Sequence, residues 1–368
     1  MANAADVAGR YGLHAIKQDI VRTETMASTS SLPTTPAAPA DLPKVRLDWT
    51  PLALAPLLML LAFPLIGSGS TWLTLTIAGL AMGMIVFVVS SGLTLVFGLM
   101  DVLNFGHGAF IALGAYVAAS VLLPLGAWVE ADSLALNLAV FGLAILAAMV
   151  AAGAIGFLFE RIVVRPVYGQ HLKQILITMG GMIVAEQLIK AIWGAETIAL
   201  QVPTTFRGAV LLGDASIEKY RLIAVVLGLA IFVSMVLVLN RTRIGLLIRA
   251  GVENREMVES LGYRIRRLFI GVFVVGAGLA GMGGVLWGLY QQNITAAIGA
   301  QVNVLIFIVI IIGGLGSTTG CFVGALLVGL MANYTGFLFP KLALFSNILL
   351  MVMILLWRPQ GLYPVAKR

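Results

Sequence analysis

Residues 266–290 read RRLFIGVFVVGAGLAGMGGVLWGLY, and this stretch decides the class of fold. It is long enough to cross a bilayer, which takes about 20 mainly apolar residues in an α-helix. Small residues recur within it at every fourth position, namely Gly276, Ala280, Gly284 and Gly288. Small residues at this spacing let helix backbones approach closely in lipid, where the hydrophobic effect does not drive helix association. The stretch therefore predicts a membrane-spanning helix inside a compact bundle.

The whole chain has the same character as this stretch. Of its 368 residues, 60% are hydrophobic and 11% are charged, whereas soluble domains are about 45–50% apolar and about 25% charged. A soluble fold of this length does not hide so much apolar surface, and disordered chains are poor in apolar residues. The composition therefore predicts an all-α, polytopic transmembrane helical bundle in a lipid bilayer.

Apolar segments of spanning character recur along the chain. The first is short and contains three prolines, the third begins at a glycine-rich break, and the eighth and ninth meet at residues 313–320. Because each of these places can be a half-helix, we expect about 8–10 spans with broken or re-entrant Gly-rich segments. The ten candidates are 51–66, 72–98, 107–126, 134–158, 175–194, 221–239, 266–290, 303–320, 321–338 and 342–357.

The N-terminal residues 1–50 differ in composition from the rest. Ser, Thr, Ala and Pro dominate residues 28–43, which favours extended chain over a buried core. We expect 1–50 to be a polar, disordered cytoplasmic extension, with a weak amphipathic helix over 11–22 as the alternative. Residues 51–358 then form the transmembrane domain, and 359–368 form a cytoplasmic tail.

The net charge of +7 is concentrated in one segment. Residues 240–267 carry seven of the 23 Lys and Arg residues, and bases beside membrane spans favour the cytoplasmic side. The segment 127–133 holds Glu130 and Asp132 without a base, so we expect it outside. With ten spans, both termini are cytoplasmic. Orientation and lipid contact therefore explain the basic balance, and no nucleic acid is implied.

Sequence motifs for catalysis, nucleotide binding and metal binding are missing. Every Lys lacks a following Ser or Thr, so no phosphate-binding P-loop is present. The single Cys321 and the spacing of the three His residues form no metal site, and no catalytic triad or carboxylate pair stands out. We expect no catalytic residue, no metal and no cofactor bound by this chain. If the chain takes part in ATP-driven transport, the ATPase must be another chain.

The basic segment 240–267 also predicts one or two short helices. Glu253, Glu256 and Glu259 alternate with Arg along it. Two interpretations stay open: a solvated positive-inside loop, or a helix that docks onto a cytoplasmic partner. The residues expected to form its apolar side are Leu246, Leu247, Ala250, Met257, Val258 and Leu261.

Four motifs in order resemble the permease subunits of ABC importers for branched-chain amino acids, amides or urea. Each motif alone is weak, whereas four in this order are specific, and together they cover about residues 75–362. They are GLTLVFG at 92–98 leading to NFGHG at 104–108, RAGVEN at 249–254 followed by Leu261-Gly262, GGLGS at 313–317, and RPQGL at 358–362. The pair Glu160-Arg161 and Arg165-Pro166 fits the same pattern.

The resemblance implies one transmembrane subunit of an ATP-driven importer in the bacterial inner membrane. The subunit would translocate a branched-chain amino acid or a similar small polar solute, such as an amide or urea. A second related permease would complete a heterodimer, two cytoplasmic ATPase subunits would bind ATP and Mg, and an extracytoplasmic solute-binding protein would deliver the solute.

Two sets of residues take their expected roles from this resemblance. Those at the ATPase contact would be Arg249, Glu253, Asn254 and Gly262, with Gly262 allowing a sharp exit from a short helix. The structural glycines would be Gly106, Gly108, Gly313, Gly314 and Gly316.

The chain also departs from the family pattern. Arg255 follows the Glu-Asn pair where proline is frequent, which indicates a specific ATPase partner. Leu305 stands where a lysine is frequent, which questions whether the solute is an ordinary branched-chain amino acid. The lead-in over residues 1–66, with its additional apolar segment, is not part of the usual pattern.

Polar groups within the spans are candidates for the solute pathway, because they are costly in a bilayer. We single out Asn104, His107, Glu186 and Thr295. As alternatives, Asn104 caps a helix and His107 satisfies backbone at the break, and Glu186 is merely neutralised by Lys190 four residues on. Glu186 otherwise contacts the ammonium of a solute or a partner helix. The alternative function is a stand-alone secondary transporter or channel.

Overall fold

The computed structural model describes residues 50–253 and 255–364. The predicted disordered extension therefore lies outside the described residues, except for its last residue. Six of the described helices are long and apolar enough to cross a membrane, and four further apolar helices are shorter. The prediction of an all-α polytopic bundle is confirmed, and six of the described helices reach spanning length where the sequence predicted about 8–10 spans. These helices are α3 (Thr50–Ile66), α4 (Gly69–Met100), α5 (His107–Leu122), α7 (Leu134–Phe159), α8 (His171–Trp193), α9 (Lys219–Arg241), α12 (Ile265–Gln291), α13 (Ile298–Gly313), α14 (Thr318–Leu338) and α15 (Ala343–Trp357).

Helices α4 and α12 form the centre of the bundle. α4 packs against α14 and α12, and α12 also packs against α5 and α7. Most of the apolar stretch of α4 and of α12 is buried, whereas α8 and α9 are largely exposed at the periphery. The bundle therefore has a covered core of long helices and an outer layer that meets lipid or other chains.

Glycines bring the central backbones into direct contact. A Cβ atom added at Gly284 of α12 would lie 2.1 Å from the carbonyl oxygen of Ile111 in α5. One added at Gly276 would lie 2.8 Å from the carbonyl oxygen of Gly92 in α4. These are the contacts that the four-residue spacing predicts, because only a residue without a side chain fits where two helix backbones touch.

Several predicted boundaries are wrong. The third span ends at Leu122 rather than 126, and a separate short helix, α6 (Gly126–Glu130), follows it. The eighth span begins at Ile298 rather than 303 and ends at Gly313, because Gly314 and Gly316 turn the chain with φ of +97° and +79°. The remaining helical turns are η1 (Glu160–Val164), η2 (Arg165–Val167), η3 (Thr204–Phe206) and η4 (Pro340–Leu342).

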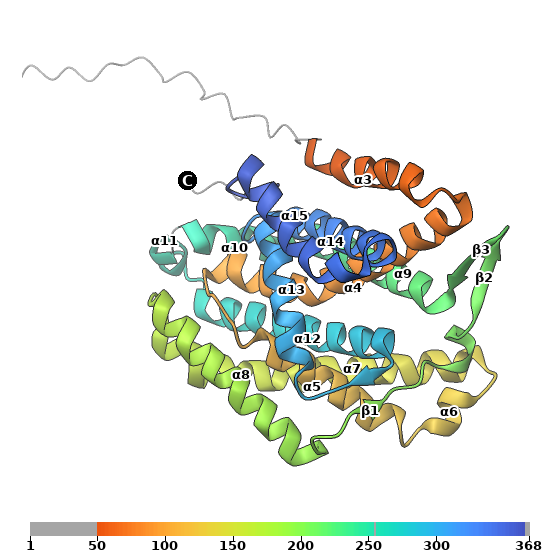
Figure 1. Cartoon of the computed structure of the whole chain (residues 1–368). Coiled ribbons are helices and arrows are strands. Elements are labelled where there is room, and N and C mark those ends of the chain that lie inside the picture. Colours follow the sequence, from red (N-terminus) through yellow and green to blue (C-terminus); the bar gives the residue numbers. More distant parts are fainter. Residues whose placement is uncertain (1–49, 254, 365–368) are drawn as a thin grey trace, which may run out of the picture. The chain divides into compact units, whose positions relative to one another are not determined.

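The two ends of the bundle carry different elements (Figure 1). The short helices α10 (Arg243–Glu253) and α11 (Arg255–Ser260) lie at one end, which we call the α10 end. Two antiparallel strand pairs, which the sequence analysis missed, and α6 lie toward the other end. The pairs are β1 (Ile198–Ala199) with β4 (Asn293–Ile294), and β2 (Ala209–Leu212) with β3 (Ala215–Glu218).

Candidate functional site

The chain between α4 and α5 is a non-helical break inside the bundle. The backbone N–H and C=O groups there have no helical hydrogen-bond partners, and lipid offers none. Side chains must therefore supply the hydrogen bonds. The amide of Phe105 donates to Thr178 Oγ1 of α8 at 3.1 Å. The carbonyl of Phe105 accepts from Asn303 Nδ2 of α13 at 2.9 Å. The break is thus fastened from two sides by buried side chains of distant segments.

Asn104 and His107 both serve this break. The side-chain oxygen of Asn104 accepts from the amide of Gly106 at 3.0 Å. Gly106, and not Asn104, is the N-cap residue of α5, so the predicted capping role of Asn104 is wrong. His107 Nε2 lies 3.1 Å from the carbonyl oxygen of Val89 and must donate to it, because that oxygen only accepts. The histidine therefore satisfies a backbone group of α4, as its structural alternative predicts.

The glycines beside the break bring α5 against α13. A Cβ atom at Gly108 would lie 2.4 Å from the carbonyl oxygen of Gly299, and one at Gly299 would lie 2.3 Å from that of Gly108. A Cβ atom at Gly106 would lie 2.7 Å from the ring of Phe159 in α7. The first turns of α5 and α13 therefore touch through their backbones.

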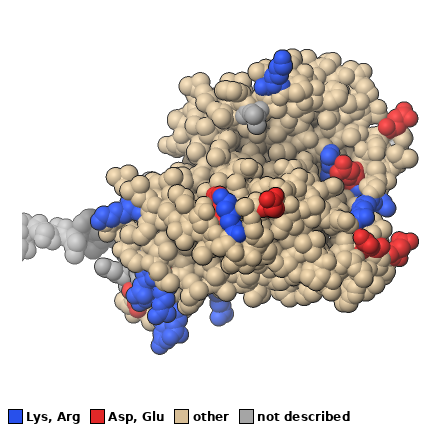
Figure 2. All heavy atoms as spheres, turned by 60° about the horizontal axis from the view of Figure 1, so that its bottom comes forward, with Lys and Arg blue, Asp and Glu red and all other residues tan. Residues whose placement is uncertain are grey.

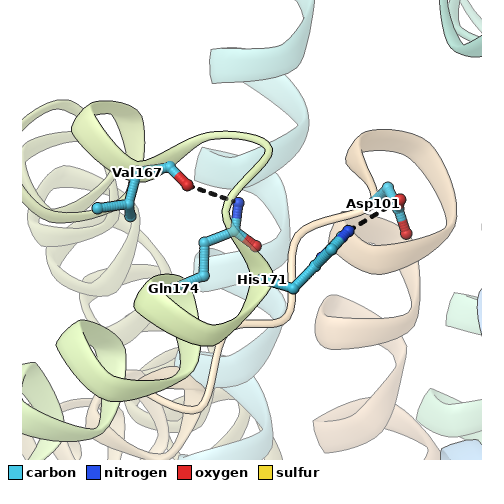
Figure 3. A network of polar contacts seen from close by, with 4 residues as sticks. All are labelled: Asp101, Val167, His171 and Gln174. Atoms are coloured by element: carbon cyan, nitrogen blue, oxygen red, sulfur yellow. Dashed lines mark hydrogen bonds and ion pairs between the residues drawn. The ribbon is translucent and has the colours of Figure 1, made fainter.

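Three polar side chains and one methionine share one face of α8. Gln174, Thr178, Met182 and Glu186 follow at every fourth position, which places them above one another on the helix. Gln174 is buried and donates through Nε2 to the carbonyl oxygen of Val167 at 3.1 Å (Figure 3). This spacing of four residues is a sequence signal that could have identified Gln174. Asn303 has no comparable signal in the sequence.

The exposed start of α8 is tied to the end of α4. His171 Nε2 lies 3.9 Å from Asp101 Oδ2, and Figure 3 shows the two side chains reaching across from their helices. Asp101 ends α4 with a left-handed backbone, at φ of 52°. This contact places the end of α4 and the start of α8 at the same end of the bundle.

Glu186 and Lys190 form an ion pair within α8. Lys190 Nζ lies 2.7 Å from Glu186 Oε1, and the two side chains are 35% and 24% exposed. This is the mutual neutralisation that the spacing of four residues predicts. Thr295 lies elsewhere, between β4 and α13, where its carbonyl oxygen accepts from the amide of Ile298 at 3.0 Å. The four pathway candidates thus belong to three segments: the break before α5, helix α8 and the start of α13.

Helix α10 rests on the bundle through a glycine-rich face. Thr242 Oγ1 accepts from the amide of Gly245 at the start of the helix, at 3.3 Å. A Cβ atom at Gly251 would lie 2.8 Å from Ile265 Cδ1 of α12, and Ile248 between the two glycines is buried. Because this face is the inner one, Ile244 and Leu246 elsewhere on α10 are turned outward.

The predicted apolar side of the 240–267 segment is therefore partly wrong. Val258 is buried, as expected of a packed residue. Leu246 and Leu261 instead are 63% and 67% exposed, and Ile244 beside them is 52% exposed. Large apolar residues thus lie in the open at the α10 end.

Gly262 ends α11 as the sequence predicts. Its φ is +87°, a conformation that glycine adopts without strain. Its amide donates to the carbonyl of Glu259 at 3.0 Å, and the amide of Tyr263 donates to that of Val258 at 3.3 Å. This pair of bonds is a Schellman motif, which turns the chain sharply out of the helix.

Of the other residues of the predicted ATPase contact, Arg249 and Glu253 are described and Asn254 is not. Arg249 is exposed on α10 and donates through Nη1 to Asn240 Oδ1 at 3.2 Å. Glu253 is the last residue of α10, and Asn254 lies outside the described residues.

Three of the motifs meet at the end of α13. The amides of Leu362 and Tyr363 donate to the carbonyls of Ile312 and Gly313, both at 2.9 Å. These bonds satisfy carbonyl groups that the end of a helix leaves open. A Cβ atom at Gly316 would lie 2.6 Å from Cα of Gly98, so the end of α4 closes the same junction. The motifs at 92–98, 313–317 and 358–362 are therefore parts of one packed unit.

Within the part of the chain that the structure describes, no group of three or more His, Cys, Asp or Glu side chains is placed to hold a metal ion.

Comparisons with known proteins agree on one family. The model of the family described as branched-chain amino acid transport system / permease component matches residues 75–357. The high-affinity branched-chain amino acid transport system permease protein BraD of Pseudomonas aeruginosa is 28% identical over 294 residues, covering 77% of this chain and 93% of BraD.

Two proteins of Escherichia coli named as permease proteins of the same kind of system also match. LivH is 27% identical over 291 residues, covering 77% of this chain and 92% of LivH. LivM is 28% identical over 316 residues, covering 77% of this chain and 69% of LivM. No solved structure matches the chain.

Proposed function

The chain belongs to the branched-chain amino acid transport system / permease component family, and from this premise we propose that it is the membrane subunit of an ATP-driven importer in a bacterial inner membrane. The solute is a branched-chain amino acid or a similar small polar molecule, such as an amide or urea. As a permease component the chain provides the passage, and separate subunits bind ATP and Mg and hydrolyse the nucleotide.

The charge distribution supports a cytoplasmic position for the α10 end. Basic side chains predominate at this end and acidic ones at the opposite end (Figure 2). Bases beside spans favour the cytoplasmic side. Arg358 donates through Nη2 to Thr50 Oγ1 at 3.0 Å, so the start of α3 and the end of α15 lie together. Both termini are then cytoplasmic.

The ATPase contact is formed by α10 and α11. One observation carries this assignment: α10 is seated on the bundle by Gly245 and Gly251, while Leu246, Leu261 and Arg249 face away from it. Exposed apolar side chains beside charged ones are typical of a protein–protein contact. Because Gly251 touches the first turn of α12, a force on α10 reaches a central helix directly.

The remaining partners follow from the family. A second, related permease pairs with this chain, and the match to both LivH and LivM of one organism supports a heterodimer. An extracytoplasmic binding protein delivers the solute at the end that carries the strand pairs. Arg255, in place of the frequent proline, makes the ATPase partner specific.

The decisive experiment reverses a charge at the proposed contact. Glu253→Lys should reduce ATP-dependent uptake of radiolabelled L-leucine to background in cells that express the whole system, and the ATPase should no longer co-purify. The matched control is Glu130→Lys, at an exposed position of α6 toward the opposite end, which should keep both properties. Membrane abundance is measured for each variant. Full uptake by the Glu253 variant contradicts the assignment, and flux that persists without ATP supports a stand-alone transporter instead.

A further inference from the structure

We infer that a small cleft between α5, α8 and α13 binds the charged head of a zwitterionic α-amino acid. This inference rests on the proposed function and deepens it, because it locates the solute and states its charge. The cleft is lined by the first turns of α5 and α13 and by the C-terminal half of α8. The lining residues are Gly108, Ala109, Ala112, Met182, Glu186, Ile189, Ala296, Gly299 and Ala300.

Two helix N-termini meet at this cleft. α5 begins at His107 and α13 at Ile298, and their first turns touch at Gly108 and Gly299. The first amides of a helix have no helical partner and carry a partial positive charge. Neither N-cap, Gly106 or Ala297, supplies a side-chain cap. The two helix starts are therefore suited to a carboxylate, as in transporters with broken helices.

A buried acceptor lies beside the cleft and has no donor. Asn303 follows Gly299 by one turn of α13 and is 6% exposed. Its amide nitrogen donates to Phe105 and lies 3.8 Å from Sδ of Met182, which lines the cleft. Its Oδ1 atom has no hydrogen-bond partner among the described residues. A buried acceptor left open in this way is costly, and the ammonium of a solute would satisfy it.

Glu186 provides the matching negative charge. It lines the cleft one turn beyond Met182, and only its Oε1 atom is engaged by Lys190. The ion pair is neutral as a whole, so a solute that carries one positive and one negative group adds no net charge to a low-dielectric region. The ammonium would bind between Glu186 and Asn303, and the carboxylate at the helix starts. A neutral amide or urea makes neither charged contact.

The rest of the lining suits an aliphatic side chain. The alanines of α5 and α13, with Ile189, give the cleft an apolar wall. The cleft has a volume of about 10 Å³, enough for about one water molecule, so it is too small here to hold an amino acid. α8 is the most exposed of the six long helices and has α5 as its main helical neighbour. Loading therefore requires α8 to move away from α5.

The test uses L-photo-leucine, a zwitterion that carries a photoreactive diazirine. It is applied to membranes that contain the complete transporter, and the labelled peptides are identified by mass spectrometry. We expect labels on residues 107–112, 182–190 or 296–303, with competition by L-leucine. Leucinamide, which lacks the carboxylate, and 4-methylpentanoate, which lacks the ammonium, should each compete about 10- to 100-fold less well, the value of one charged hydrogen bond.

Variants separate a ligand site from a structural ion pair. Glu186→Gln should raise the half-saturating concentration of L-photo-leucine about 10- to 100-fold. Glu196→Gln, at an exposed position just after α8, is the matched control and should leave it unchanged. The double variant Glu186→Lys with Lys190→Glu restores a structural pair but not the site, so it should accumulate normally and bind weakly.

Three results would overturn the inference: labelling confined to other segments, unchanged saturation in Glu186→Gln, or full binding by the double variant. If a variant fails to accumulate, the positions labelled in the wild-type protein still decide whether the cleft is the binding site. The proposed function is judged separately by the ATP dependence of uptake. If uptake depends on ATP but the labels lie in other segments, only the proposed binding site is refuted. If the labels lie in the cleft but uptake does not depend on ATP, only the proposed importer function is refuted.

Discussion

Helices α12 and α8 are both apolar spans, yet they have opposite surroundings. In the most apolar stretch of α12, 67% of the residues are buried, against 11% in α8. α12 touches α4, α5 and α7, and glycines carry the contacts. α8 has α5 as its main helical neighbour, and its buried residues are Gln174, Thr178 and Ile189. The comparison indicates a fixed centre and a movable outer helix.

The difference follows from how helices associate in lipid. Close backbone contact through small residues stabilises α12 on several sides. α8 is held by a few hydrogen bonds to buried polar groups, and such bonds contribute only about 0.5–1.5 kcal/mol each. A helix attached in this way separates from the bundle at low cost. We therefore expect α12 to respond to steric changes and α8 to respond to the loss of polar groups.

The largest effect is expected for Gly284→Ala in α12. The added Cβ atom would lie 2.1 Å from the carbonyl oxygen of Ile111, so two backbones must separate, at a cost of about 3 kcal/mol. Gly271→Ala in the same helix meets nothing within 4 Å and should be neutral or stabilising by about 0.5–1 kcal/mol. The thermal midpoint of the purified protein checks both. Equal midpoints would remove the basis for a fixed centre.

A smaller loss is expected for Thr178→Val in α8. The change keeps the shape but leaves the amide of Phe105 without its acceptor, which costs about 2 kcal/mol for a buried group. The control is Thr74→Val, because Thr74 bonds only to the carbonyl of Ser70 within its own helix. Hydrogen exchange of the break should rise in the first variant alone. Unchanged protection of residues 101–106 would mean that α8 does not hold the break.

The smallest effects are expected for two adjacent glycines of α8. A Cβ atom at Gly181 would lie 2.6 Å from the ring of Phe159, and a ring can shift, so Gly181→Ala should cost about 1 kcal/mol. Gly180→Ala meets nothing within 4 Å and should stabilise by about 0.5–1 kcal/mol through helix propensity. Thermal midpoints that move in the same direction would show that α8 packs differently from this description.

Much of the fold could be predicted from the sequence, because lipid leaves few options to an apolar chain. Length and hydropathy located the spans, and the repeat of Gly276 and Gly284 indicated a closely packed helix. The helix ends near residues 298 and 122 were predicted wrongly. An uncharged segment such as 291–302 has no charge that marks where a span begins. The short strand pairs were not predicted, because strands of two to four residues are too short to show an alternating hydrophobic pattern.

The candidate site was predicted less well. Its key contacts join residues far apart in the sequence, such as Asn303 with Phe105, and no local pattern indicates such a pair. Asn104 was interpreted as a helix cap from its position, but the N-cap residue of α5 is Gly106, two residues later. Gly262 was predicted correctly because the ending of a helix is decided within a few residues.

The contact between α13 and the residues after α15 has a consequence for how the protein is made. The last carbonyls of α13 receive their donors from Leu362 and Tyr363, which leave the ribosome only after α14 and α15 have been synthesised. Until then the carbonyls of Ile312 and Gly313 lack the donors that this segment supplies. A nascent chain that stops before 362 therefore displays a defect that quality-control proteases can recognise, and completion of translation removes it.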